Sequence, residues 1–161
     1  MSKNYCDAYP KDDINIFKGL RVLVVDDTKD ILFLVTYLLE SYGIQVMTAN
    51  NASSALSLIK RFPVDLLISD LAMPWYDGYW LIQKIRQLTQ LQNREIPAIA
   101  FSSSAEAKAR EKALAAGFQT YIEKPSHLEQ LITEVAKLLL RSGKSSPKNL
   151  AGQGRNGINL V

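Results

Sequence analysis

Four polar positions in this sequence follow apolar runs, and their side chains suit chemistry on a phosphoryl group. Asp26-Asp27 follows VLVV, Asp70 follows DLLIS, Ser102 ends AIAFS and Lys124 follows TYIE. An aspartate carboxylate is a known nucleophile that forms an aspartyl-phosphate. Lysine and serine side chains can donate to phosphoryl oxygens, Lys124 as a mobile cation and Ser102 as a hydroxyl.

Three carboxylates in one crevice repel one another and raise one another's pKa values unless a cation lies among them. Oxygen ligands with open coordination positions suit Mg²⁺, which takes one or two carboxylates together with a phosphate. We therefore expect Asp26 and Asp27 to help hold Mg²⁺. We expect Asp70 to be both a metal ligand and the nucleophile.

Each of these signals has a plainer alternative when it is taken alone. Asp26-Asp27 could be a helix N-cap pair, and Asp70 could cap a turn. Lys124-Pro125 is a common dipeptide, and SSS at 102–104 is an ordinary loop sequence. The chemical interpretation depends on all of them lying at the ends of successive strands.

The elements that must position these residues follow from the apolar pattern. Five short runs lack polar alternation, which indicates strands of a parallel sheet that is covered on both faces; they are 20–26, 44–49, 65–70, 97–102 and 119–123. Helical segments fill the intervals at 30–43, 51–62, 79–91, 105–117 and 126–141. Asn50 or Asn51 and Ser126 are candidate N-caps, and Gly43 and Gly117 are candidate helix ends.

Five strand–helix units in succession predict an α/β doubly wound fold with right-handed crossovers. The flavodoxin-like (βα)5 sandwich, with a five-stranded parallel sheet of order 2-1-3-4-5, is the expected topology. Sites in such sheets form outside the carboxyl ends of the strands, near the switch point. All of the polar residues above would then meet at one edge.

Composition separates a folded body from its ends. The formal charge of +3 is misleading, because residues 141–161 contribute +4 and residues 1–140 sum to −1. A neutral body with a basic tail does not favour nucleic acid binding. We predict a polar N-terminal extension over 1–18, one domain over 19–141 and a disordered basic tail over 142–161, which could make a weak electrostatic contact.

Cysteine usage and hydropathy indicate the compartment. Cys6 is the only cysteine, so no intramolecular disulfide can form, and a reducing cytoplasm is the expected location. No apolar run reaches the ~18–20 residues of a membrane span, so no membrane insertion is expected.

The blocks VLVVDD, DLLISDLAMPWYDG, AIAFSSS and AAGFQTYIEKP occur in this order. In this order they resemble the signature blocks of the receiver domain of two-component response regulators, over roughly residues 19–141. The resemblance implies that Asp70 is the phosphoacceptor, Asp26 and Asp27 the acidic pair at the metal, and Lys124 the lysine of the site. It further implies that Ser102 is the switch hydroxyl and Tyr121 the switch aromatic.

Two further features are implied by the same resemblance, and a third is our own hypothesis. The backbone carbonyl of Ala72 would be the remaining Mg²⁺ ligand, and the Lys124-Pro125 bond could be cis. Phosphorylation would move Ser102 toward the phosphoryl group and let Tyr121 enter the vacated space, which repacks the face formed by 105–117, 119–123 and 126–141. The alternative for Tyr121 is an ordinary core aromatic residue. Trp75 and Tyr76 could form a rim that is partner-specific or shields the site, or they could be scattered exposed aromatics.

The expected function is therefore that of a single-domain response regulator, a phosphoacceptor signalling domain that is not an enzyme in the usual sense. It would accept a phosphoryl group on Asp70 from a sensor histidine kinase or a phosphotransfer protein and signal by contact with a downstream protein. No kinase block occurs in the sequence, and the 20 residues after the domain are too few for an effector domain. The resemblance also allows a homodimer through the face just defined.

Two other classes of protein stay open. One is a phosphate-independent interaction scaffold that has kept the fold. The other is an aspartyl-phosphate hydrolase of the haloacid dehalogenase kind, but that family has D-x-D after its first strand, where this chain has DDTKD. The scaffold interpretation is opposed by the presence of the complete set of site residues, which are Asp26, Asp27, Asp70, Ser102 and Lys124.

Overall fold

The computed structural model describes residues 17–124 and 128–143. It contains a five-stranded parallel sheet whose strands are β1 Arg21–Val25, β2 Gln45–Ala49, β3 Leu66–Ser69, β4 Ala98–Ser102 and β5 Thr120–Glu123. The helices are α1 Lys29–Glu40, α2 Ala52–Arg61, α3 Gly78–Arg86, α4 Leu91–Arg94, α5 Ala107–Ala116 and α6 Leu128–Arg141.

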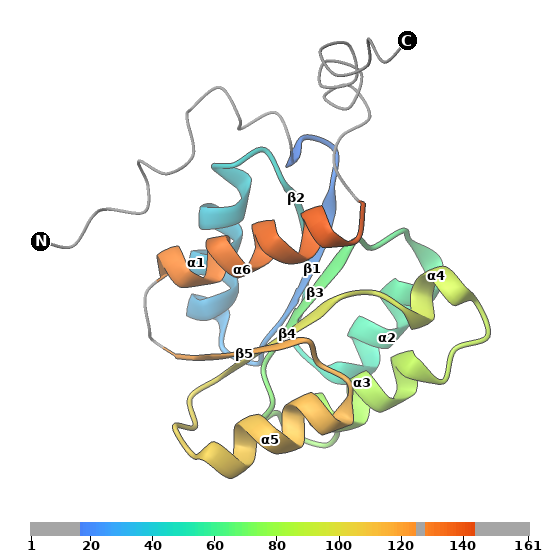
Figure 1. The fold of residues 1–161 in the computed structure, drawn as a ribbon, viewed down its shortest axis with the longest axis vertical. Coiled ribbons are helices and arrows are strands. Elements are labelled where there is room, and N and C mark those ends of the chain that lie inside the picture. Colours follow the sequence, from blue (N-terminus) through green and yellow to red (C-terminus); the bar gives the residue numbers. More distant parts are fainter. Residues whose placement is uncertain (1–16, 125–127, 144–161) are drawn as a thin grey trace, which may run out of the picture.

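The strand order is β2-β1-β3-β4-β5, and every neighbouring pair is parallel, which confirms the predicted flavodoxin-like topology. Helices cover both faces of the sheet: α1 and α6 lie on one face, and α2, α3 and α5 lie on the other (Figure 1). The two edge strands expose polar side chains, β2 those of Gln45 and Thr48 and β5 that of Glu123. No helix in the described part of the chain is long and apolar enough to cross a membrane.

The sheet separates two hydrophobic clusters, and β1 contributes to both. Val22 and Val24 pack among the side chains of α1 and α6, whereas Leu23 and Val25 pack among those of α2, α3 and α5. This follows from the two-residue period of a strand, which sends successive side chains to opposite faces. All four residues of β3 are buried because helices cover both faces of the sheet, as the unbroken apolar run predicts.

The structure confirms one of the predicted helix N-caps and shows a second N-cap that was not predicted. The Asn51 side chain accepts a hydrogen bond of 2.8 Å from the Ser54 backbone N–H, so Asn51 is the N-cap of α2. The Asp77 side chain accepts from the Trp80 backbone N–H at 2.8 Å and caps α3 in the same way. The Gly117 backbone, with φ of 126°, ends α5.

The helix expected over residues 79–91 is interrupted. The structure ends α3 at Arg86 and forms the separate short helix α4 before β4. The Arg86 side chain explains how the chain turns back: its Nη1 donates to the carbonyl oxygens of Arg94 and Ile96, both at 2.7 Å. These bonds hold the returning segment beside the last turn of α3, and the hydrophobic pattern alone does not encode them.

Several predictions fall outside the described residues. They concern the extension over 1–18 except its last two residues, the basic tail beyond Gly143, the Ser126 cap and the conformation of the Lys124-Pro125 bond. The domain limits at 18/19 and 141/142 stay predictions.

Candidate functional site

Two neighbouring strands deliver the three acidic side chains to one edge of the sheet. The end of β1 lies beside the end of β3, with Val25 in register with Ser69. Asp26 and Asp70 are therefore each one residue beyond a strand end, and the Asp70 backbone N–H donates to the Val25 carbonyl at 2.8 Å. The backbone at the nucleophile position is thus fixed by the sheet itself.

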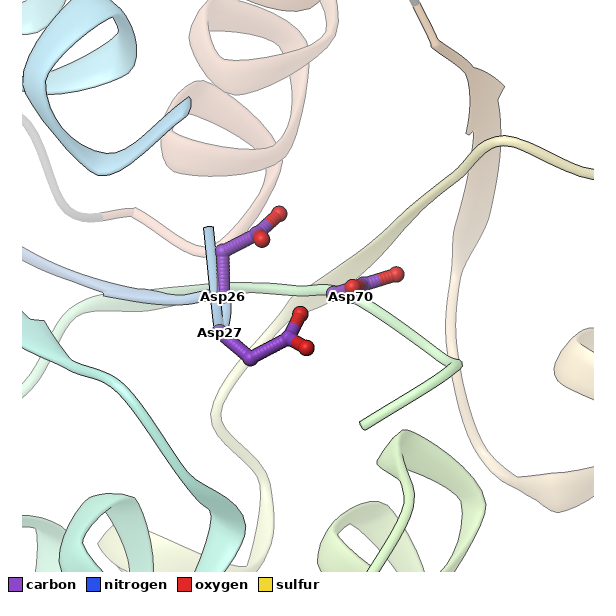
Figure 2. Close-up of side chains that lie close together, drawn as sticks. All are labelled: Asp26, Asp27 and Asp70. Carbon is purple, nitrogen blue, oxygen red and sulfur yellow. The ribbon is translucent and has the colours of Figure 1, made fainter. Parts of the chain in front are cut away.

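The three carboxylates form one cluster. Each of Asp26, Asp27 and Asp70 offers an oxygen atom that lies within 4.8 Å of those of the other two. Figure 2 shows Asp26 and Asp27 on the adjoining end of β1 and Asp70 beside them. Asp26 and Asp70 are almost fully buried, with 1% and 6% of their surface exposed, whereas Asp27 is exposed. The cluster therefore has a buried floor and an open rim.

One cation enters the cluster from β5. The Lys124 Nζ atom lies 2.5 Å from Asp26 Oδ2 and 3.4 Å from Asp70 Oδ2. The Lys124 backbone N–H donates to the Ser102 carbonyl at 2.6 Å, so a hydrogen bond at this lysine joins the ends of β4 and β5. The ammonium also lies 5.5 Å from the centre of the Phe101 ring. Lys124 thus offsets part of the negative charge of the two buried acids.

Burial raises the pKa of Asp70 above the ordinary value of 3.8. The Lys124 ammonium lowers this pKa, and the nearby Asp26 carboxylate raises it. The Ala72 backbone N–H also lowers it by donating to Asp70 Oδ1 at 3.3 Å. Desolvation outweighs the contacts with Lys124 and the Ala72 N–H. The ionised form of Asp70 is therefore destabilised, and added positive charge would stabilise it.

The donor set fits a hard divalent cation. It consists of carboxylate oxygens only, on two buried residues and one exposed residue, which leaves coordination positions open toward solvent. Mg²⁺ prefers this combination and keeps several of its waters. The residues present are therefore compatible with Mg²⁺ bound by Asp26, Asp27 and Asp70.

The helix N-cap alternative for Asp26-Asp27 is not what the structure shows, whereas Asp70 does cap the turn that follows it, since its Oδ1 accepts from the Ala72 backbone N–H. The N-cap residue of α1 is Thr28, and it makes no side-chain capping bond. Asp26 Oδ1 instead accepts from the Thr28 backbone N–H at 2.9 Å, two residues along the chain, while its Oδ2 contacts Lys124. Asp26 therefore shapes the β1–α1 loop and belongs to the cluster at the same time.

Close packing under the nucleophile requires a glycine at position 78. A Cβ atom at Gly78 would overlap the Asp70 carbonyl oxygen and lie 2.9 Å from Leu71 Cα. Both of these atoms belong to the backbone, which cannot move aside as a flexible side chain could. The Asp-Gly pair at 77–78 therefore does two things, since Asp77 caps α3 and Gly78 lets the helix approach the loop after β3.

Ser102 and Tyr121 lie on adjacent strands, and both are buried. Ser102 Oγ accepts from the Ser104 backbone N–H at 3.3 Å, and the Tyr121 hydroxyl donates to the Ser104 carbonyl. The segment after β4 thus connects the two residues predicted to form a switch. Ala72 lies at the surface of the loop after Asp70, and the role of its carbonyl stays a prediction.

Sequence reasoning missed one feature of this edge. A cavity of about 580 Å³ adjoins Asp27 and is lined by residues 50–53 and 74–76. The bulky Trp75-Tyr76 pair was a signal for it, but the three loops that enclose the cavity are far apart in sequence.

Comparisons with known proteins agree with this geometry. The family model described as the response regulator receiver domain matches residues 22–136. An uncharacterized 14.6 kDa protein from Leptolyngbya boryana is 41% identical over 119 residues, which are 74% of this chain and 89% of that protein. The sensor histidine kinase GacS of Pseudomonas protegens is 35% identical over 118 residues, or 73% of this chain, but the match spans only 13% of the kinase.

Solved structures show the same likeness. The receiver domain of the Francisella response regulator 1452 superposes with a TM-score of 0.71 and 31% identity, over 77% of this chain and 99% of that one. The chemotaxis protein CheY4 of Vibrio cholerae gives a TM-score of 0.69 and 27% identity, over 74% of this chain and 98% of that one. The chain therefore belongs to the response regulator receiver domain family, whose members are phosphoacceptor signalling domains of two-component systems.

Proposed function

We propose that this chain accepts a phosphoryl group on Asp70 from a phosphohistidine of a sensor histidine kinase or phosphotransfer protein, in a reaction that requires Mg²⁺. The observation that carries the proposal is the position of the Asp70 carboxylate. It lies at a strand end, beside two further acids and 3.4 Å from the Lys124 ammonium. The family's relation to histidine kinases supports the choice of donor, since kinases such as GacS contain a matching segment.

In the proposed transfer, one Asp70 oxygen forms a bond to phosphorus as the bond between phosphorus and the donor imidazole nitrogen breaks. The imidazole keeps the bonding electron pair and takes up a proton, and the product is an acyl phosphate on Asp70. Asp26, Asp27, Asp70 and the Ala72 carbonyl would hold Mg²⁺, which supplies positive charge for the phosphoryl oxygens when it is bound. The metal and Lys124 would together balance the charge that a phosphoryl group adds, about −1.5 to −2.

Lys124 and Ser102 would stabilise the product. The lysine side chain already contacts both buried acids, so a small rotation lets it donate to a phosphoryl oxygen on Asp70. Ser102 would give up its contact with the Ser104 N–H and donate its hydroxyl to another phosphoryl oxygen.

The signal would leave the site through Tyr121. The hydroxyl of this residue contacts the same Ser104 that Ser102 contacts, so a shift of Ser102 changes the environment of the ring. The ring is already buried in this structure, with 9% of its surface exposed. Phosphorylation would then favour this inward position over an outward one and alter the face formed by α5, β5 and α6, where a downstream protein or a second copy would bind.

Intact mass measurement after incubation with acetyl phosphate and Mg²⁺ tests the proposal. We expect a mass increase of one phosphoryl group on the wild type and none on Asp70→Asn. Asp65→Asn is the matched control, because Asp65 precedes β3 at the opposite end and accepts from the Arg21 backbone N–H at 2.8 Å; this variant should still be modified. No adduct on any variant would favour the phosphate-independent scaffold, and turnover of a phosphate ester would favour the hydrolase.

The switch has its own test. Chemical shifts of α5, β5 and α6 should change when beryllofluoride and Mg²⁺ are added as a phosphoryl mimic. Unchanged shifts on this face, in a sample whose Asp70 region responds, would refute the switch while leaving the phosphoacceptor role intact.

A further inference from the structure

The Trp75 backbone adopts a conformation that tryptophan rarely takes. Its φ angle is 71°, and among the described residues it is the one non-glycine position with positive φ. Such a conformation is unfavourable for any residue with a Cβ atom. The side chain is 96% exposed, so burial of the ring within this chain does not offset the strain. The fold therefore presents a large aromatic ring to the outside at an energetic cost.

The base of this loop is packed against α3. Tyr76 stacks on Trp80 of α3, with ring centroids 4.1 Å apart and planes inclined by 22°. The Tyr76 backbone N–H donates to the Pro74 carbonyl at 2.9 Å, and the Asp77 cap anchors the start of α3. The residues on either side of Trp75 are thus anchored to the start of α3.

A cavity lies next to this ring. Its volume is about 580 Å³, and its walls are Asp27 after β1, residues 50–53 at the start of α2, and residues 74–76 after β3. Asp27 is also the exposed member of the carboxylate cluster. The cavity is therefore continuous with the rim through which any donor must reach Asp70.

The chemistry of the walls favours a cation. Among the described residues, Asp27 is the one charged residue that lines the cavity, and Trp75 and Tyr76 supply aromatic rings, whose faces attract positive charge. Asn50 and Asn51 add side-chain amides. A guanidinium group matches this set better than an ammonium, because it is planar, less strongly hydrated, stacks on aromatic faces and can bond a carboxylate with two parallel N–H groups.

We infer that the cavity between residues 50–53 and 74–76 is a subsite that receives an arginine side chain of the protein that donates the phosphoryl group. That this arginine belongs to the donor protein rests on the proposed function, since the donor is the protein that must approach this rim. In this arrangement the guanidinium stacks on Trp75 and pairs with the outer oxygen of Asp27. Trp75 is then a residue that determines which donor binds.

Two short peptides test the chemistry directly on the full chain. The probes are acetyl-Gly-Arg-Gly-amide and the same peptide with citrulline, which has nearly the shape of arginine but no charge. The readout is the indole N–H resonance of Trp75 in the ¹⁵N-labelled protein, assigned by its absence in Trp75→Gly. We expect a saturable shift with the arginine peptide and affinity at least about fivefold weaker with the citrulline peptide.

Two variants sharpen the test. In Trp75→Gly, which has no Cβ atom and so suits the observed backbone, the backbone resonances of residues 50–53 should lose their response to the arginine peptide. Tyr37→Ala removes another exposed aromatic ring, on α1 and outside the cavity lining, and should leave the response unchanged.

Equal shifts with the two peptides, no shift with either, or a full response in Trp75→Gly would each overturn the inference. The acetyl phosphate experiment separates this outcome from failure of the proposed function. An adduct on Asp70 without arginine-selective binding refutes the subsite alone, whereas arginine-selective binding without an adduct refutes the phosphoacceptor role and leaves only the cation subsite.

Discussion

At the amino-terminal edge of the sheet, the half-buried Arg86 guanidinium donates to three backbone carbonyls. At the carboxyl-terminal edge three carboxylates lie close together, and one lysine ammonium contacts two of them. Arg86 Nε and Nη2 both reach the Gly117 carbonyl, at 3.2 and 2.9 Å, and its Nη1 reaches Arg94 and Ile96. Its Nη2 also donates to Gln119 Oε1, which in turn accepts from the Ala98 backbone N–H. The charge at this edge is spread over many acceptors.

The charges at the opposite edge are less well balanced. Asp70 is as deeply placed as a core residue, and its pKa is raised because desolvation outweighs the help of Lys124. The strained Trp75 backbone lies in the loop that follows. One edge of the sheet is therefore organised for stability, and the other is held ready for added positive charge and a phosphoryl group. Four substitutions test this difference between the two edges.

The largest change is expected at the stable edge. Arg86→Met keeps the length of the side chain but leaves the carbonyls of Arg94, Ile96 and Gly117 without their donor, and we expect the free energy of unfolding to fall by about 3 kcal/mol. Arg86→Lys is the matched control. It should recover only part of this loss, because an ammonium cannot span the three acceptors. Chemical denaturation measures both, and a loss below about 1 kcal/mol in Arg86→Met would contradict the role of this side chain.

A smaller loss is expected from Lys124→Met. This change leaves the buried acids without their cation, so stability should fall by about 2 kcal/mol in the presence of a chelator. The loss should be smaller with Mg²⁺, which would take over the positive charge. Lys137→Met is the control, since the Lys137 side chain is exposed and its pair with Glu134 at 3.3 Å contributes about 0.5 kcal/mol or less. Equal losses in the two variants would show that the Lys124 contacts have no special weight.

Asp70→Asn should instead increase the stability of the fold. The gain should be smaller than the loss from Lys124→Met, because only one of the three acids is removed. The pKa of Asp70 in the folded state lies above the ordinary value of 3.8, so the folded state binds the proton more tightly than the unfolded state. The stability that this proton contributes is lost as the pH rises through the raised pKa. Asn should therefore raise the unfolding temperature near neutral pH in chelator.

The pH dependence supplies the control for this variant. The gain should shrink below pH 3.8, where the wild-type carboxyl is protonated in both states. Asp65→Asn, which weakens an accepted hydrogen bond at the other edge, should give no gain at any pH. A pH-independent difference between wild type and Asp70→Asn would show that ionisation is not its cause.

The smallest effect is expected at Trp75. Glycine tolerates positive φ and the ring is exposed, so Trp75→Gly should increase the free energy of unfolding by about 1 kcal/mol. Trp75→Ala removes the same ring but keeps a Cβ atom and the strain, and it should leave stability almost unchanged. If both variants behave alike in thermal unfolding, the backbone at this position is not under strain.

Much of the fold follows from local pattern. The unbroken apolar runs predicted five covered parallel strands, and the alternation with helical segments predicted their order. The acids after VLVV and DLLIS were correctly expected to meet, because carboxyl ends of parallel strands share an edge. The prediction of one continuous helix over 79–91 was wrong, because the contacts of Arg86 with the returning chain are made over distance.

The sheet, its strand order and the grouping of the acids were predictable from the amino-acid sequence, because they depend on periods and strand ends that can be counted along the chain. Which charges are balanced, in contrast, depends on contacts that form only in the folded chain. The anchoring of Arg86, the raised pKa of Asp70 and the cavity beside Asp27 each depend on segments that are distant in sequence. Such segments meet only after folding, and the desolvation that they cause has no local signature.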